Sequence, residues 1–354
     1  MSRLSQAQKK AVTHKDGPMM VLAGPGSGKT LVITKRVQYL IGHYKVQPEH
    51  ILVITFTRAA AAEMRERFQR LAGKTLPVSF GTFHSVFFMM LRHAYGYRAE
   101  NILPESRKYD MIREILYDRR LDAEDDGDLI RSVIQEISLV KGQMISLDYY
   151  HSSSCGDEVF REIYEAYEKK LHQNRWIDFD DILIYTYELL KEREDIRAAW
   201  QQRFPYILID EFQDINKIQY EIVRLLAEPK RNLFIVGDDD QSIYKFRGAR
   251  PELMLRFPKD YPETQQVILN TNFRSGEEIV TFGEKIICHN TKRFPKKMEA
   301  FQGPKHPVEI RRFKDQREEN KHIVYTIREE MAKKRPLSQI CLLYTSDAAD
   351  DLIG

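Results

Sequence analysis

The sequence predicts an α/β fold built on a parallel sheet, with a block of helices inserted into it. Short apolar runs alternate with segments of helical periodicity, as expected when strands are joined by crossover helices; these runs cover residues 19–22, 51–55, 206–209 and 233–236. Between the second and third runs, residues 86–180 show few strand signals and several amphipathic helical patterns. The chain therefore divides into a sheet-forming unit and a helical insertion.

The first half of the sheet-forming unit is predicted from its turns and periodicity. The apolar run at 19–22 is followed by a glycine-rich turn, and a helix is expected from about Thr30. The run at 51–55 is followed by a helical pattern over 60–71. The later strands, 206–209 and 233–236, both end in acidic residues.

The remaining segments complete the expected domain order. One insertion helix spaces apolar and aromatic residues at helical intervals, which predicts core packing; they are Phe160, Ile163, Tyr164, Tyr167 and Leu171. A new strand is expected over 267–269, and a helix over 317–334 with its inward face formed by Ile323, Ile327 and Met331. The predicted division is 1–85 and 181–265 for the two parts of the first unit, 86–180 for the insertion, 266–340 for an incomplete second unit, and 341–354 for an irregular or non-native tail.

Composition sets the broad class. The chain has 354 residues, 42% of them hydrophobic and 30% charged, which suits two or three globular domains. A net charge of +3 neither establishes nor excludes a nucleic-acid partner. The three cysteines lie far apart, which favours a reducing cytoplasm over a disulfide framework or a metal site. The sequence shows neither a signal peptide nor an apolar run long enough to cross a membrane.

The turn after the first strand matches a phosphate-binding Walker A loop. It comprises Ala23, Gly24, Pro25, Gly26, Ser27, Gly28, Lys29 and Thr30, with alanine at the first glycine position. Glycines let backbone N–H groups converge on phosphate oxygens, and the N-terminus of the following helix favours negative charge. Lys29 is expected to reach the β- and γ-phosphates of ATP, and the Thr30 hydroxyl is expected to ligate Mg²⁺.

A second motif, which is acidic, fits nucleotide hydrolysis. Asp210 and Glu211 follow the apolar strand at 206–209, as a Walker B pair does. Asp210 is expected to hold Mg²⁺ and Glu211 to polarise the attacking water. Two adjacent carboxylates favour hydrolysis over nucleotide storage.

Several further motifs resemble those of the UvrD/Rep/PcrA-type superfamily 1 DNA helicases. Residues 210–214, Asp-Glu-Phe-Gln-Asp, resemble motif II of that family. The other matches follow in the family's order: residues 4–8 resemble the Q motif, 55–60 motif Ia, 81–85 the next DNA-contacting motif, 236–249 motif III and 269–275 motif IV. The resemblance covers about residues 4–340 and implies two RecA-like P-loop NTPase cores with ATP between them.

The resemblance also implies roles at the nucleotide. Gln8 would read adenine, and Phe273, where the family often has tyrosine, would stack on it. Gln241 would sense the γ-phosphate and link it to the DNA face. Arg274 would stabilise charge on the transferred phosphoryl group, as an arginine finger does.

DNA contacts are implied at positions matching three motifs: Phe56, Thr57, Thr82, Phe83, His84, Tyr244, Phe246 and Arg247. Aromatic stacking suits a sequence-independent motor because every base has a π-face. Phe246 replaces a tryptophan common in the family, and Arg58-Ala59 stand where many members have Asn-Lys. For each aromatic residue taken alone, core packing is the alternative. His84 is expected to orient backbone or contact a DNA phosphate rather than act as a catalytic base.

The function implied by the resemblance is an ATP-dependent helicase or translocase of single-stranded DNA and duplex junctions. It would travel 3′ to 5′ in the cytoplasm of a bacterium; repair, replication and plasmid roles, and protein partners, stay open. The acidic run 178–181 has a counterpart in the family where the insertion returns to the core, so a structural role is expected rather than a metal site.

Residues after motif IV lead to a further expectation. They show no match to motifs V and VI, and 344–354 show no family counterpart. The chain is therefore expected to be truncated, and its isolated form is expected to bind nucleotide poorly and to translocate poorly, if at all. The alternatives are a non-catalytic ATP- or DNA-binding fragment and part of a helicase–nuclease subunit.

Overall fold

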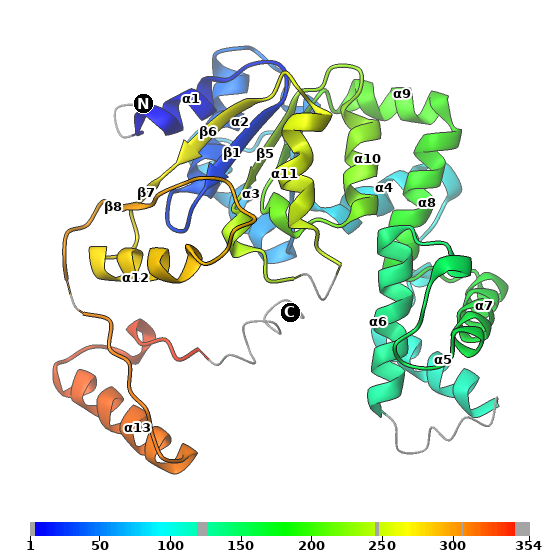
Figure 1. Cartoon of the computed structure of the whole chain (residues 1–354). Helices are drawn as coiled ribbons and strands as arrows, with labels where there is room; N and C mark the ends of the chain where they lie inside the picture. Colours follow the sequence, from blue (N-terminus) through cyan, green and yellow to red (C-terminus); the bar gives the residue numbers. More distant parts are fainter. Residues whose placement is uncertain (1–3, 119–126, 245–247, 306, 344–354) are drawn as a thin grey trace.

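A sheet of six parallel strands forms the centre of the computed structural model, which describes residues 4–118, 127–244, 248–305 and 307–343 (Figure 1). The strand order is β3-β2-β4-β5-β1-β6. The strands are β1 Met19–Ala23, β2 Ile51–Thr55, β3 Ser79–Thr82, β4 Tyr206–Ile209, β5 Leu233–Gly237 and β6 Gln265–Leu269. The predicted α/β class with a parallel sheet is therefore confirmed.

Helices cover both faces of the sheet, so successive side chains of its inner strands enter two different cores. In β1, Met19 and Val21 belong to the core beneath one set of helices, namely α1 Gln6–Thr13, α2 Lys29–Gly42 and α3 Arg58–Ala72. Met20 and Leu22 face the opposite core, formed with α4 Phe83–Tyr95, α8 Phe179–Glu192, α9 Glu194–Arg203, α10 Lys217–Ala227 and α11 Pro251–Asp260. Burial on both faces explains why these strands read as continuous apolar runs.

Strand β6 extends the first sheet instead of opening a second unit. It pairs with β1 in parallel, with Met19 opposite Gln265 and Ala23 opposite Leu269. Val267 and Leu269 are buried beneath α1–α3, whereas Ile268 is 40% exposed, the pattern of an edge strand. This pairing places the first residues of the expected second unit, 266–269, in the first sheet, while the division of the chain near residue 266 stays a prediction. Sequence periodicity identifies a strand but not the sheet that it joins.

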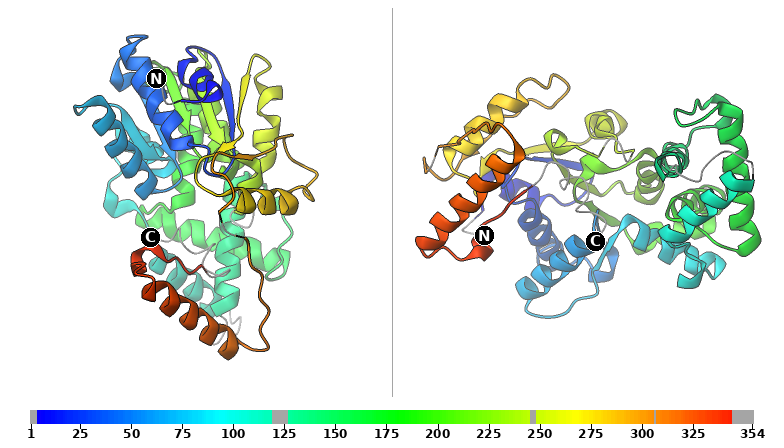
Figure 2. Two further views of the ribbon diagram at one scale, coloured as in Figure 1. Left: turned by 90° about the vertical axis from the view of Figure 1, so that its left-hand side faces the viewer. Right: turned by 90° about the horizontal axis from the view of Figure 1, so that it is seen from below.

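The helical insertion has a hydrophobic core of its own, formed by α5 Glu105–Asp118, α6 Gly127–Gln143 and α7 Asp157–Asn174. Phe160, Ile163, Tyr167 and Leu171 are buried in it and Tyr164 packs against it, which confirms the core-packing interpretation of this stripe. These helices lie at the opposite end of the molecule from α12 Glu277–Ile287 and α13 Gln316–Ala332 (Figure 2, right).

Among the described residues after β6, Val280 is the only buried apolar side chain. Short strands β7 Thr271–Asn272 and β8 Glu299–Ala300 pair in parallel beside α12, and α13 stands apart from the sheet (Figure 1). No residue of α13 is buried: of the face expected to point inward, Ile323 and Ile327 are half-buried and Met331 is 48% exposed. None of the described helices has both the length and the apolar character needed to cross a membrane.

Candidate nucleotide site and nucleic-acid interface

The carboxyl edge of the sheet carries most of the residues expected to act. Because all six strands are parallel, their carboxyl ends meet at one edge, where loops bring distant residues together. The glycine-rich loop follows β1, Phe56 and Thr57 follow β2, Asp210 follows β4, and Asp238 follows β5. This edge is where a ligand of an open parallel sheet is expected to bind.

The phosphate loop has the backbone geometry that its sequence predicts. Gly26 and Gly28 adopt φ angles of +66° and +88°, in the region that glycine tolerates without steric cost. The Ser27 hydroxyl donates to Gly24 O at 2.7 Å and closes the loop. Helix α2 then begins without a side-chain cap, which leaves N–H groups for an anion. Ala23 is the buried last residue of β1, so its methyl group packs in the core.

Gln8 lies against this loop. Its side chain is 3% exposed, and its Nε2 donates to Ser27 O at 2.9 Å. Its Oε1 accepts the N–H of Ser5 and completes a capping box at the start of α1. Both ends of the amide therefore have partners within the chain, and its expected contact with adenine stays a prediction.

Lys29 forms an ion pair with Glu211, whose nearest carboxylate oxygen lies 2.6 Å from Nζ. The exposed fractions of the two side chains are 13% and 32%, so the pair lies at the mouth of the site. The phosphate loop and the acidic Asp210–Glu211 motif are therefore in direct contact across 182 positions of sequence. In this state the lysine expected to hold phosphate is neutralised by the expected base.

Asp210 has the environment of a metal-ligating carboxylate. Its backbone N–H donates to Ile54 O, and burial followed by the neighbouring Glu211 raises the pKa of its carboxyl to about 7. Its Oδ1 is buried and has no hydrogen-bond partner among the described residues. Buried carboxylate oxygens normally have a partner, so this orphaned atom fits a ligand to Mg²⁺. Thr30 lines the same pocket, of about 390 Å³.

A glutamine links the two acidic turns at the sheet edge. Gln213 Nε2 donates to Glu211 at 2.9 Å, and its Oε1 accepts the N–H of Asp238 at 2.9 Å. Gln241 Nε2 in turn donates to Asp238 Oδ2 at 2.6 Å. A continuous chain of polar contacts therefore runs from Lys29 to Gln241. Gln213 lies within motif II but has no role predicted from the sequence; its place between Glu211 and Asp214 is the signal that could have identified it.

Asp214 is a further residue without an assigned role. Its side chain lines the pocket, and burial together with Glu211 raises the pKa of its carboxyl to about 7. Gln213 Nε2 donates to one of its oxygens at 3.2 Å, while Oδ1 has no partner among the described residues. Asp214 is therefore, after Asp210, a second carboxyl group in this pocket with a raised pKa and an oxygen without a partner among the described residues.

The segment after β7 lies directly against the phosphate loop. The N–H of Phe273 donates to Gly26 O at 3.0 Å, and Asn272 Oδ1 accepts from the N–H groups of Arg274 and Ser275. A Cβ at Gly26 would lie 2.5 Å from Asn272 Oδ1, so only glycine permits this approach. The Phe273 ring is 37% exposed, and the Arg274 side chain is exposed beside the loop.

Two aromatic residues expected at DNA lie in the same pocket. The rings of Phe56 and Tyr244 are stacked, with centroids 6.0 Å apart and planes 15° apart. Both line the pocket that contains Asp210. Thr57 also lines it, while its hydroxyl accepts the N–H of Ala60 as the N-cap of α3. The aromatic pair and the hydrolytic carboxylates thus share one cavity.

Three of the expected DNA residues, Thr82, Phe83 and His84, make contacts within the chain, and their contact with DNA stays a prediction. Thr82 caps α4 through a capping box with Ser85, and Phe83 is 2% exposed within the core, where the alternative of packing applies. His84 packs edge-to-face on Phe179, and burial lowers the pKa of its imidazole, which favours the neutral ring. Phe246 and Arg247 lie outside the described residues.

The acidic run 178–181 is structural, as expected. Asp178 caps α8 in a capping box with Asp181. Lys141, whose side chain is fully buried, lies 3.2 Å from Asp178 and 2.6 Å from Asp181, and Lys108 pairs with Asp178 and Asp180. These ion pairs join the insertion to α8. On its other side, Gln143 Nε2 donates to Gly248 O at 2.6 Å, so α6 also contacts the end of motif III.

Comparison with known proteins identifies the family. The model for the UvrD/REP helicase N-terminal domain matches residues 4–262, and the UvrD-like helicase C-terminal domain matches 267–354. The chain is 37% identical over 353 residues to the putative ATP-dependent DNA helicase YjcD of Bacillus subtilis, covering 98% of this chain and 46% of that protein. It is 35% identical to the ATP-dependent DNA helicases PcrA of Bacillus subtilis and Leuconostoc citreum, covering 100% and 98% of this chain and 49% and 47% of those proteins.

These matches also correct one expectation. The C-terminal family model extends through residue 354, so the expectation that 344–354 have no counterpart in the family is wrong, and it no longer supports truncation. The structure of that segment lies outside the described residues. The chain spans about half the length of the curated relatives it matches. With both family models matched, the N-terminal one over well more than half of the chain, the chain belongs to the UvrD/REP helicase family.

Proposed function

We propose that this chain carries the nucleotide site and the single-stranded-DNA face of an ATP-dependent DNA helicase. The observation that supports this most strongly is the chain of polar contacts at the carboxyl edge of the sheet. It connects Lys29 to Glu211, Gln213, Asp238 and Gln241. Gln241 shares its pocket with the stacked rings of Phe56 and Tyr244. A rearrangement of these polar contacts at the phosphates therefore alters the surroundings of a base-stacking surface.

The proposed roles at the nucleotide combine the family resemblance with the geometry of the phosphate loop. Lys29 and the N–H groups at the start of α2 hold the β- and γ-phosphates, and Arg274 approaches from the segment beside Gly26. Thr30 and Asp210 hold Mg²⁺, which when bound offsets charge on the phosphates. Gln8 and Phe273, which bond to Ser27 O and Gly26 O of the loop, contact the adenine in this proposal.

Glu211 acts as the base in this proposal. Phosphate oxygens compete for the Lys29 ammonium, and the loss of that 2.6 Å ion pair frees the Glu211 carboxylate to polarise water. The same movement changes the acceptor available to Gln213 Nε2 and, through Asp238, the partner of Gln241. Hydrolysis and the DNA face are coupled in this way.

The proposed substrate is single-stranded DNA next to a duplex junction. Stacking of bases on Phe56 and Tyr244 is independent of sequence, which suits a translocating motor. Travel in the 3′ to 5′ direction, and work in repair or replication, are proposed from the family resemblance. A reducing, cytoplasmic setting agrees with three cysteines that are all free.

A hydrolysis assay tests the proposal. ATP turnover is measured for the chain in excess over ATP, with and without an oligothymidylate, beside Lys29→Ala. The matched control is Lys35→Ala on the same helix, whose ammonium donates to Gln38 away from the phosphate loop. We expect slow hydrolysis that DNA stimulates in the native chain and in Lys35→Ala, and none in Lys29→Ala. Equal hydrolysis by the native chain and Lys29→Ala would overturn the proposed site.

A further inference from the structure

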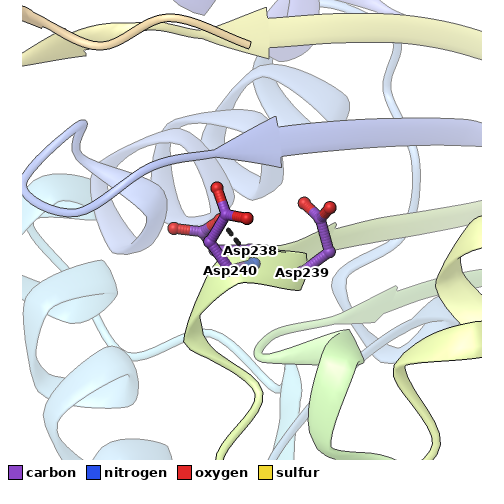
Figure 3. Close-up of side chains that lie close together, drawn as sticks. All are labelled: Asp238, Asp239 and Asp240. Atoms are coloured by element: carbon purple, nitrogen blue, oxygen red, sulfur yellow. Dashed lines mark hydrogen bonds between the residues drawn. The ribbon is translucent and has the colours of Figure 1, made fainter. Parts of the chain in front are cut away.

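A compact group of carboxylates follows β5. Asp238, Asp239 and Asp240 form an acidic turn in which one ligand oxygen from each lies within 4.8 Å of the others (Figure 3). Such a group resembles a cation site, but here a cation of the chain itself fills it. Lys296 Nζ lies 2.8 Å from Asp238 Oδ1 and 2.9 Å from Asp240 Oδ2, and it also contacts Asp239. The Lys296 side chain is 1% exposed.

Neighbouring residues strengthen this attachment. The Arg293 guanidinium forms two contacts with Asp240, at 2.8 and 2.7 Å, and the N–H of Phe294 donates to Asp239 Oδ2 at 2.7 Å. Burial opposes the charge on Lys296, but the surrounding carboxylates outweigh it and raise the pKa of its ammonium. Residues 293–298, termed here the clasp segment, are therefore bound to the acidic turn by charged groups at neutral pH.

The acidic turn and the nucleotide site share Asp238. Its Oδ1 contacts Lys296, its Oδ2 accepts from Gln241, and its N–H donates to Gln213. The position of the Lys296 ammonium therefore affects the orientation of the Asp238 carboxylate relative to Gln241. At the other end of the clasp segment, Met298 lies against Gly24 so closely that a Cβ there would collide with its sulfur.

Stability alone is a poor reason for such a cluster. Withdrawing a lysine and three carboxylates from water carries a large desolvation cost, and apolar residues of similar size often serve stability as well or better. Contacts of this kind instead fix one arrangement of chain segments. Here the arrangement joins the residues after β7 to the turn that holds Gln241.

We propose that Lys296 is a positioning residue that orients Asp238 toward Gln241 and seats Met298 on the phosphate loop, so that attachment of the clasp segment couples nucleotide turnover to DNA. This inference rests on the proposed function. It assigns Lys296 no contact with nucleotide or DNA. Its effect passes through Asp238, so substituting Lys296 and Gln241 together must give less than the product of the two separate effects.

The test compares Lys296→Met with Lys297→Met, which changes the adjacent exposed lysine. The readout is the ratio of single-turnover ATP hydrolysis rates with and without oligothymidylate. We expect Lys296→Met to lower this ratio at least tenfold, Lys296→Arg to restore part of it, and Lys297→Met to leave it unchanged. In Gln241→Ala, adding Lys296→Met should cause little further loss.

Amide hydrogen exchange supplies a readout independent of activity. Lys296→Met should speed exchange in residues 293–298, whereas Lys297→Met should not. If Lys296→Met fails to fold, Arg293→Gln is used. It removes the two contacts to Asp240 and one to Lys296 O but keeps the Lys296 ammonium, so a smaller loss of stimulation is expected. Faster exchange with unchanged stimulation would overturn the inference. Absence of hydrolysis in the native chain would instead count against the proposed function.

Discussion

Replacing Lys141 with methionine should destabilise the helical insertion severely. The Lys141 side chain is fully buried and lies 2.6 Å from Asp181, 3.2 Å from Asp178 and 2.7 Å from Glu168. Methionine retains most of the apolar stem but removes the charge. Asp178 then keeps Lys108 as its ion-pair partner, whereas Asp181, also 1% exposed, keeps no ion pair among the described residues. Breaking a buried ion pair from one side costs about 3–5 kcal/mol.

The assay follows unfolding of the insertion alone. The chain has two tryptophans, and Trp176 packs against the insertion core while Trp200 lies in the core of the sheet unit. In a Trp200→Phe background, urea unfolding monitored by Trp176 fluorescence therefore reports the insertion. The control is Lys170→Met, whose partner Glu114 is half exposed, and which should cost about 0.5 kcal/mol.

The pH dependence of the Lys141→Met loss has a definite sign. A carboxyl group whose pKa is raised by folding favours the folded state at low pH and loses that contribution as pH rises. Burial and Asp178 already raise the pKa of Asp181, and removal of Lys141 raises it further. The loss should therefore be smaller at pH 5 than at pH 8. A loss below about 1 kcal/mol, or one independent of pH, would refute the reasoning.

Three further outcomes are expected. Glu211→Gln should slow hydrolysis yet tighten ATP binding about fivefold or more, because removing a charge-assisted contact worth about 1 kcal/mol frees Lys29; calorimetry showing weaker binding would contradict this. Asp214→Asn removes a carboxyl whose pKa folding raises to about 7. Between pH 5 and pH 8 the unfolding free energy of this variant should therefore fall less than that of the native chain, with a difference of at most about 4 kcal/mol. An equal fall in both proteins would refute this. Phe56→Ala should weaken oligothymidylate binding by about 1–3 kcal/mol in fluorescence anisotropy, without loss of ATP binding; unchanged DNA affinity would exclude Phe56 from the interface.

Local patterns were sufficient where a few neighbouring residues determine the outcome. Gly26 and Gly28 tolerate the positive φ angles of the phosphate loop, and the apolar runs of β1 and β4 predict burial on both faces of the sheet. The acidic residues at the strand ends follow from the same logic, since parallel strands end at one edge. The phosphate loop and the Asp210–Glu211 pair could therefore be placed from sequence.

Contacts between distant segments could not be read from local patterns. Val267 and Leu269 identify a strand, but only the assembled sheet shows that it pairs with β1. Phe83 matches a motif position yet packs in the core, because the helix α4 that it begins turns that side chain inward. Lys296 lies 58 positions beyond Asp238 (296 − 238 = 58) and carries no local signature of its partner.

We propose that one pocket binds Mg·ATP and that binding there is coupled to the binding of DNA. Isothermal calorimetry of Mg·ATP binding, with and without saturating oligothymidylate, tests both parts of this claim. The account predicts that the native chain binds Mg·ATP, that DNA changes the affinity, and that Lys29→Ala abolishes binding while Lys35→Ala retains it. Equal affinity of Lys29→Ala and the native chain, or an affinity that DNA leaves unchanged, would contradict it.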